Sequence, residues 1–331
     1  MAVIYYMHPN PSRQLQDSLA RRGVYLKCVD RNNIQCAEKI IFFDLDRTLL
    51  RQCLDAGMNP DRLVLFLYEP DAVFPYQYDE RVWRHFGQIF TWRDDLVDNV
   101  RFFKYKWPLR RRIKSPLPDF HERKLVAMIN ANKYSFVHGE GYSYRRKAIR
   151  FFDTCGEFDL YGLGWNDSAC LMNRGNFVTA VRSRKLITFI KNLLELRSYK
   201  SYLGPVADKD ETLSHYRFCL CFENQLNRLG YITEKIFDCF VSGAIPVYMG
   251  ATNVDEYIPR DCFIAMNEMK SFEYLLEYMQ SMRYEQFRAF QQAGQEFIMS
   301  GAFHQWTHEG VYEDVADKLM CGRCAQIKSG A

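Results

Sequence analysis

Continuous apolar segments alternate with helical stretches along the first third of the chain, and this alternation limits the possible folds more than any other feature. The apolar segments occupy residues 2–7, 24–29, 39–45, 62–68, 88–92 and 101–108. A strand that is apolar at every position must be covered on both faces, which is typical of a parallel sheet between two layers of helices. The sequence therefore predicts a parallel, doubly wound α/β unit.

A second alternating series follows a break in this pattern. Residues 109–123 contain a basic run and two prolines, which favours an interdomain linker. The apolar segments then resume at residues 124–130, 158–164, 216–224, 244–250 and 262–266. From about residue 271 onward the pattern is helical. The chain therefore holds two alternating series and a helical end.

Two consecutive Rossmann-like domains with a helical tail are typical of the two-lobed GT-B glycosyltransferases, whose two domains face a cleft. A chain of 331 residues is long enough for two domains of about 150 residues each. We expect an acceptor-binding domain at residues 1–118, a nucleotide-sugar-binding domain at 119–300 and a helical tail at 301–331.

Charge and cysteine content restrict the partners and the compartment. The net charge of +4 is too small to indicate a nucleic-acid-binding protein. The N-terminus lacks the basic region of a signal peptide, and no apolar run reaches the length of a membrane span. The odd number of eleven cysteines favours a reducing environment over a disulfide framework. We therefore expect a cytoplasmic protein.

Residues 216–250 carry the most informative pattern. A buried strand ends at Glu223, and an amphipathic helix begins around Thr233. Lys235 lies in the first turn of this helix, where a cation opposes the helix dipole. An anion bound at the helix N-terminus would explain its presence, as in a nucleotide site. The alternative is a solvated lysine paired with the neighbouring Glu234.

This stretch resembles the donor-binding motif of the α-1,3/4-fucosyltransferases, glycosyltransferase family 10. The resemblance rests on "CFEN", "YITEK", "VSGAIPVYMG" and "YIPRDCFI", in this order, and weaker similarity extends over residues 60–310. It implies an inverting transferase that moves L-fucose from GDP-fucose to a hydroxyl of a GlcNAc-type acceptor. It also implies that neither a cofactor nor a metal is required.

The resemblance assigns the binding of GDP-fucose to a set of residues in the second domain. These are Arg145, Glu223, Asn224, Tyr231, Thr233, Glu234 and Lys235. Tyr231, Glu234 and Lys235 match the residues that hold the diphosphate and the ribose, and Glu223 and Asn224 match the fucose side. Arg145 has the spacing of the family's diphosphate arginine, although its neighbour Arg146 is an alternative match.

Glu69 matches the family's proposed general base. It ends the apolar strand in "LVLFLYEPDAVFPYQYD", and the carboxyl ends of parallel strands are where such sheets bind ligands. The form "LYEP" departs from the "GEN" of some family members.

The stretch "IIFFDLDRTLL" offers an alternative function. An apolar strand followed by Asp44, Asp46 and Thr48 has the order found in aspartyl phosphohydrolases of the haloacid dehalogenase type. Against this, the strand is the third of the chain, and Arg47 occupies a position where those enzymes favour a small residue. We therefore expect both aspartates to be strand-end residues facing the cleft or solvent.

Two further possibilities stay open. His304, His308, Cys321 and Cys324 have a spacing compatible with zinc, although no finger pattern supports such a site. A non-catalytic glycan-binding protein with the GT-B fold is also conceivable, but the donor residues are intact. Since the family has bacterial members, we expect an oligosaccharide or glycolipid acceptor, as in lipopolysaccharide assembly. Arg110–Arg112 would then contact the inner membrane.

Overall fold

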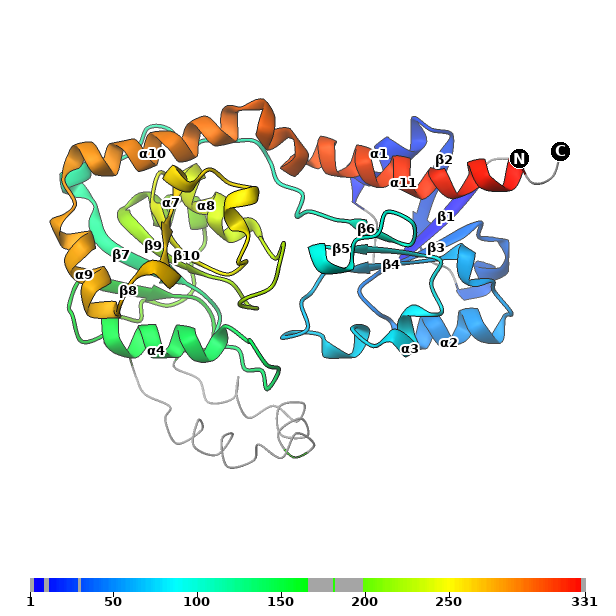
Figure 1. The fold of residues 1–331 in the computed structure, drawn as a ribbon, viewed down its shortest axis with the longest axis horizontal. Helices are drawn as coiled ribbons and strands as arrows, with labels where there is room; N and C mark the ends of the chain where they lie inside the picture. The colour runs from blue at the N-terminus through cyan, green and yellow to red at the C-terminus, as the bar shows by residue number, and fades with distance from the viewer. Residues whose placement is uncertain (1–2, 9–11, 29–30, 166–180, 182–198, 329–331) are drawn as a thin grey trace. The chain divides into compact units, whose positions relative to one another are not determined.

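The computed structural model describes residues 3–8, 12–28, 31–165, 181 and 199–328. It divides into two compact units (Figure 1). Unit 1 comprises residues 1–110 and 303–331, and unit 2 comprises residues 111–302. Each unit is built on a parallel β-sheet with helices, which confirms the predicted fold class.

The sheet of unit 1 has six strands in the order β2-β1-β3-β4-β5-β6. They are β1 (Val3–His8), β2 (Val24–Cys28), β3 (Lys39–Phe43), β4 (Leu63–Leu67), β5 (Gln88–Thr91) and β6 (Phe102–Lys104). All five residues of β4 are fully buried, with Val64 and Phe66 in one core layer and its three leucines in the other. Apolar side chains on both faces explain why this strand has no polar alternation.

Helices cover both faces of this sheet. The layer that contains Val64 is covered by α1 (Arg13–Ala20) and α11 (His308–Lys328). The opposite layer is covered by α2 (Arg47–Asp55), with the short α3 (Glu80–Trp83) at its margin. Both faces of unit 1 are therefore covered by helices, as a parallel sheet that is apolar on both faces requires.

Helix α11 belongs to unit 1, which differs from the separate tail expected at residues 301–331. Val311, Val315 and Leu319 of α11 are buried in the same core layer as Leu15 and Leu19 of α1. Ion pairs tie the two helices together at 3.2 Å, from Arg21 to Glu313, and at 2.7 Å, from Arg22 to Asp317. Because α1 has only eight residues, the last helix of the chain supplies the apolar cover that α1 lacks.

Unit 2 contains a five-stranded parallel sheet in the order β11-β10-β9-β7-β8. Its strands are β7 (Lys124–Ile129), β8 (Phe158–Tyr161), β9 (Tyr216–Phe222), β10 (Ile245–Met249) and β11 (Ile264–Ala265). Its described helices are α4 (Tyr142–Phe152), α7 (Lys209–Ser214), α8 (Glu234–Ser242), α9 (Phe272–Ser281) and α10 (Tyr284–Met299). Helices α4 and α9 share a core layer with the sheet, and α8 contacts β9 and β10.

The basic stretch that was predicted to be a linker belongs largely to unit 2. Arg112 forms an ion pair with Asp210 at 2.7 Å, and the backbone N–H of Lys114 donates to the carbonyl of Val241 at 2.9 Å. Arg111 donates to the carbonyl of Ser300 at 2.9 Å. The connection between unit 1 and unit 2 is therefore much shorter than the linker predicted at residues 109–123.

Two further predictions can be compared with the described residues. Among them, no helix has the length and apolar character that crossing a bilayer requires. The eight cysteines with described surroundings all carry free thiols.

Candidate active site

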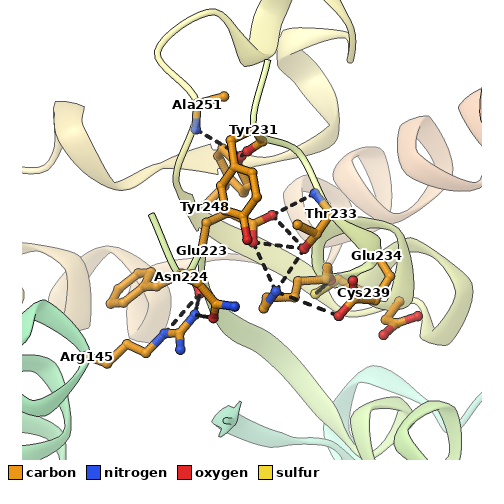
Figure 2. A network of polar contacts seen from close by, with 12 residues as sticks. Arg145, Glu223, Asn224, Tyr231, Thr233, Glu234, Cys239, Tyr248 and Ala251 are labelled. Carbon is orange, nitrogen blue, oxygen red and sulfur yellow. Dashed lines mark hydrogen bonds and ion pairs between the residues drawn. The ribbon is translucent and has the colours of Figure 1, made fainter. Parts of the chain in front are cut away.

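The carboxyl end of β9 places a charged side chain in the interior of unit 2. Glu223 has no exposed surface. Its carboxylate accepts a hydrogen bond from the backbone N–H of Thr233 at 2.9 Å, and the Thr233 hydroxyl lies within 2.9 Å of both carboxylate oxygens. An isolated carboxylate in this position would cost several kcal/mol. Glu223 can therefore be buried because the hydrogen-bond donors shown in Figure 2 surround its carboxylate.

Lys235 supplies the compensating charge. It is the second residue of α8, and its Nζ atom lies 3.0 Å from Glu223 Oε2 and 2.8 Å from the Thr233 hydroxyl. The carboxylate of Glu234 is farther away, at 3.7 Å. Burial acts to lower the pKa of Lys235, but Glu223 and then Glu234 outweigh this effect and raise the pKa. The ammonium group therefore stays charged at neutral pH.

This pairing revises the explanation for a cation in the first turn of α8. The alternatives were an external anion or Glu234, whereas the structure places the buried Glu223 closest to the ammonium group. The resemblance puts Glu223 on the fucose side, yet its carboxylate is enclosed by Thr233 and Lys235. In the structure Glu223 is thus the partner of Lys235 and not a surface-lining group.

Arg145 fixes the chain on both sides of Glu223. It lies on α4, is 2% exposed, and donates from Nε to the carbonyl of Phe222 at 3.1 Å. Its Nη2 donates to Asn224 Oδ1 at 2.9 Å (Figure 2). Burial lowers the pKa of the guanidinium, while the nearby Tyr142 and Glu223 act to raise it. The buried Arg145 and the partly exposed Lys235 thus flank the fully buried carboxylate of Glu223.

Two glycines that the sequence analysis did not single out allow this packing. A Cβ atom on Gly141 would lie 2.1 Å from the carbonyl oxygen of Glu223, and one on Gly250 would lie 2.6 Å from its Cγ. The N–H of Gly141 also donates to the carbonyl of Asn224 at 2.8 Å. Since both glycines belong to other segments, only contact information could have identified them.

A tyrosine outside the predicted set holds the loop that precedes α8. The hydroxyl of Tyr248, on β10, donates to the carbonyl of Tyr231 at 3.3 Å and accepts from the N–H of Ala251 at 3.1 Å (Figure 2). Tyr231 and Thr233 are each 1% exposed. The tyrosine and threonine of "YITEK" therefore shape the site from inside.

The predicted donor residues gather at one place in unit 2. Arg145, Glu223, Tyr231 and Thr233 are buried, whereas the members of the set that retain accessible surface are Asn224, Glu234 and Lys235. Arg146 lies apart from them. Its guanidinium is 4.0 Å from the ring centroid of Tyr134, and its Nη1 donates to the carbonyl of Lys133 at 2.8 Å. Of the two adjacent arginines, only Arg145 joins the described network around Glu223.

Helix α8 carries a partly buried carboxylate, Asp238, which allows a pH-dependent prediction. Burial raises its pKa to about 6, against the opposing effect of Lys209 at 3.5 Å. Because the pKa is raised in the folded state, stability is lost as pH rises from about 4 through about 6. Asp238→Asn should therefore stabilise the protein near neutral pH by about 1–2 kcal/mol, with no gain near pH 4. Thermal unfolding at the two pH values would check this, and an equal gain at both would contradict it.

Glu69 lies in unit 1, two residues beyond the end of β4, and is half-buried. Its backbone N–H donates to Asp44 at 2.9 Å, and its carbonyl accepts from the Tyr78 hydroxyl at 2.8 Å. The structure thus places Glu69 at the carboxyl edge of the parallel sheet of unit 1, as the sequence predicts.

The two aspartates of "FDLDRT" both accept hydrogen bonds from the chain near the end of β3. Asp46 is the N-cap of α2 and accepts from the backbone N–H groups of Thr48 and Leu49 at 2.8 and 2.9 Å. Asp44 accepts from backbone groups at the end of β4. Both carboxylates are therefore used by the chain itself, which disfavours a phosphohydrolase nucleophile at this position.

The histidines of the hypothetical zinc set lie in unit 1. His304 belongs to a short 3-10 helix and His308 begins α11. In the part of the chain that the structure describes, no three His, Cys, Asp or Glu side chains are grouped to hold a metal. The side chains of Cys321 and Cys324 lie outside the described residues.

The sequence matches a known family over its C-terminal part. The family model described as "Glycosyltransferase family 10 (fucosyltransferase) C-term" matches residues 168–331. Over 83 residues, the chain is 39% identical to the alpha-(1,3)-fucosyltransferase FucT of Helicobacter pylori, a match that covers 25% of this chain and 17% of the relative. It is 28% identical to an alpha-(1,4)-fucosyltransferase of Arabidopsis thaliana, over 70% of this chain and 63% of that protein. The matches thus span less than two thirds of these relatives.

Solved structures share the fold over nearly the whole chain. A crystal structure of an alpha1,3-fucosyltransferase has a TM-score of 0.57 at 12% identity, covering 96% of this chain and 90% of that one. Another, with GDP-fucose, has a TM-score of 0.55 at 15% identity and covers 100% of this chain and 91% of that one. At these identities the structures speak for the fold alone. The family match and the curated relatives show that the C-terminal part of the chain, residues 168–331, belongs to glycosyltransferase family 10, the fucosyltransferase family.

Proposed function

We propose that this protein is an inverting fucosyltransferase that moves L-fucose from GDP-fucose to a hydroxyl of a GlcNAc-type acceptor. This proposal rests on the arrangement of Arg145 and Lys235 around the end of β9. The end of β9 lies inside the motif of family 10. The donor is taken from the relatives, which are named fucosyltransferases, and from the fold neighbour that was solved with GDP-fucose.

The charges of unit 2 support the binding of a diphosphate. Arg145 and Lys235 place two positive charges beside the fully buried carboxylate of Glu223, and Glu234 lies 3.7 Å from Lys235. The N-terminus of α8 adds partial positive charge, because the side chain of its N-cap residue Thr233 bonds Glu223 instead of capping the helix. The side chain of Lys235 is 19% exposed, so it is the cation of this pair that a bound ligand would contact.

The reaction requires a base and a stabilised leaving group. In our proposal Glu69 removes the proton from the acceptor hydroxyl, whose oxygen attacks the anomeric carbon of fucose from the face opposite GDP. The bond between fucose and the diphosphate breaks, and GDP carries away the resulting negative charge. Lys235, Arg145 and the helix terminus stabilise this charge by fixed electrostatics. Unit 1 would bind the acceptor and unit 2 the donor.

The acceptor and the cellular setting are further parts of the proposal. We infer an oligosaccharide or glycolipid of a surface glycan or lipopolysaccharide, modified in the cytoplasm at the inner membrane. Arg110, Arg111 and Arg112 are all exposed, so the basic run is accessible to an anionic surface, although Arg111 and Arg112 also contact groups of unit 2. A transfer assay with GlcNAc- and LacNAc-type acceptors would test the acceptor class.

The donor can be tested without knowing the acceptor. GDP-fucose and GDP should raise the thermal stability of the protein, whereas UDP- and ADP-sugars should not. At a ligand concentration of about 100 times Kd, the gain should correspond to roughly 2.7 kcal/mol. Thermal shift or calorimetry with a panel of nucleotide sugars measures this directly. Equal stabilisation by UDP-sugars would refute the proposed donor.

Fucosyl transfer should continue in the presence of EDTA. The proposed mechanism assigns stabilisation of the leaving diphosphate to Arg145 and Lys235, which are held in place by Asn224 and Glu223. Initial rates with and without EDTA should therefore agree. A complete loss of activity that Mg²⁺ or Mn²⁺ restores would show that a metal performs this task.

A further inference from the structure

Asp44 has an unusual backbone conformation at the end of β3. Its φ angle is +62°, in the left-handed region that few residues other than glycine adopt. Its N–H donates to the carbonyl of Phe66 at 2.9 Å, which holds the turn against β4. Aspartate is among the residues best tolerated in this conformation. The turn brings the side chain of Asp44 to the carboxyl end of the neighbouring strand, where it makes the contacts described next.

A single oxygen of Asp44 accepts three hydrogen bonds. Its Oδ1 accepts from the backbone N–H groups of Tyr68 and Glu69, both at 2.9 Å, and from Gln77 Nε2 at 2.8 Å. Hydrogen bonds to an ionised acceptor are roughly twice as strong as those between neutral groups. Asp44 therefore fixes the direction of two successive N–H groups, the second of which belongs to Glu69.

The other side of Glu69 is held just as firmly. Its carbonyl accepts from Gln77 Nε2 at 2.9 Å and from the Tyr78 hydroxyl at 2.8 Å. Gln77 is fully buried, and its Oε1 accepts from the N–H of Leu45 at 3.1 Å. The carbonyl of Gln77 accepts in turn from Trp83 Nε1 at 2.7 Å. Both polar backbone groups of Glu69 are thus tied to a rigid part of unit 1.

We propose that Asp44 and Gln77 are positioning residues that fix the backbone of Glu69 so that its carboxylate meets the acceptor hydroxyl at a defined angle. This inference rests on the proposed function, in which Glu69 is the base. In the proposed reaction Glu69 accepts the proton of the acceptor hydroxyl, and the hydrogen bonds of Asp44 and Gln77 converge on this residue. Since misplacement by about 1 Å can cost 100-fold in rate, such a device affects turnover and not only folding.

The test separates positioning from stability. Asp44→Gly removes the acceptor without adding strain, because glycine accepts a positive φ. Asp44→Asn keeps an oxygen acceptor and tolerates the same backbone, so it serves as the conservative rescue. Asp46→Ala is the matched control, because it removes the neighbouring carboxylate, which caps α2. Hydrogen exchange of the Tyr68 and Glu69 amides is measured alongside kcat, the KM for GDP-fucose and thermal stability.

We expect Asp44→Gly to speed exchange at both amides and to lower kcat by roughly 10- to 100-fold, with the KM for GDP-fucose unchanged. Asp44→Asn should recover most of both effects, and Asp46→Ala should lower stability without changing kcat. Unchanged exchange in Asp44→Gly would overturn the inference whatever the reaction is. Faster exchange with normal kcat would reduce Asp44 to a structural role. If the wild-type protein transfers no fucose, the proposed function fails, while the exchange result still reports whether Asp44 holds Glu69.

Discussion

Lys235→Ala should lower the stability of the protein as well as its affinity for GDP. Removing the ammonium group leaves Glu223 buried at 0% exposure with only the neutral donors of Thr233. Breaking a buried pair in this way typically costs 3–5 kcal/mol. Because the Lys235 side chain is 19% exposed, we expect the lower end, about 3 kcal/mol. Urea unfolding of the ligand-free protein measures this loss in the free energy of unfolding.

The effect on GDP is separate and can be isolated. Loss of a charge-assisted hydrogen bond to the diphosphate should weaken GDP binding by about 1.5–3 kcal/mol, which is roughly 10- to 150-fold in Kd. The double variant Glu223→Gln with Lys235→Met removes both charges at similar volume. It should regain much of the lost stability, since no buried carboxylate is left without its lysine, yet it should bind GDP as weakly as Lys235→Ala.

Two outcomes would contradict this account. If Lys235→Ala unfolds like the wild type, Glu223 does not depend on its ammonium group in solution. If the double variant binds GDP with normal affinity, Lys235 does not contact the diphosphate, and the assignment of the donor site to the N-terminus of α8 fails.

The strands and helices of both units could be predicted from the sequence because burial on both faces of a sheet produces a simple pattern of apolar residues. A strand such as β4, "LVLFL", is apolar at every position, and the breaks between such strands show where the helices lie. The loop before α8 was equally readable, since "YITEK" is a local motif. For the same reason the prediction placed Glu69 correctly at the end of β4.

Contacts between residues that are far apart in the sequence produce no comparable sequence pattern. Helix α11 packs on α1 through pairs such as Arg22 with Asp317, which are 295 positions apart. The sequence of the last helix therefore did not indicate which helix it contacts. The close approach of Gly141 to Glu223 likewise depends on how α4 meets β9. For Glu223, the sequence showed a strand-end carboxylate but not that Lys235, twelve residues later, neutralises it.

Glu69→Gln should abolish most of the turnover and leave the rest of the protein intact. Glutamine has nearly the same shape but cannot accept a proton at neutral pH, so kcat should fall by roughly 10²- to 10⁴-fold. The backbone hydrogen bonds of residue 69 survive the change, and in our proposal GDP binds to unit 2. Affinity for GDP and thermal stability should therefore match the wild type.

Glu80→Gln is the matched control for this prediction, because Glu80 is an exposed glutamate in the same unit. It should keep wild-type kcat, GDP affinity and stability. Full turnover in Glu69→Gln would mean that another group takes the proton. Glu223 would be a poor replacement, since its carboxylate is enclosed by Thr233 and Lys235. Asp71, two residues beyond Glu69 in the same segment, would then be the carboxylate to replace next, with the same three measurements deciding whether it fails in turnover alone.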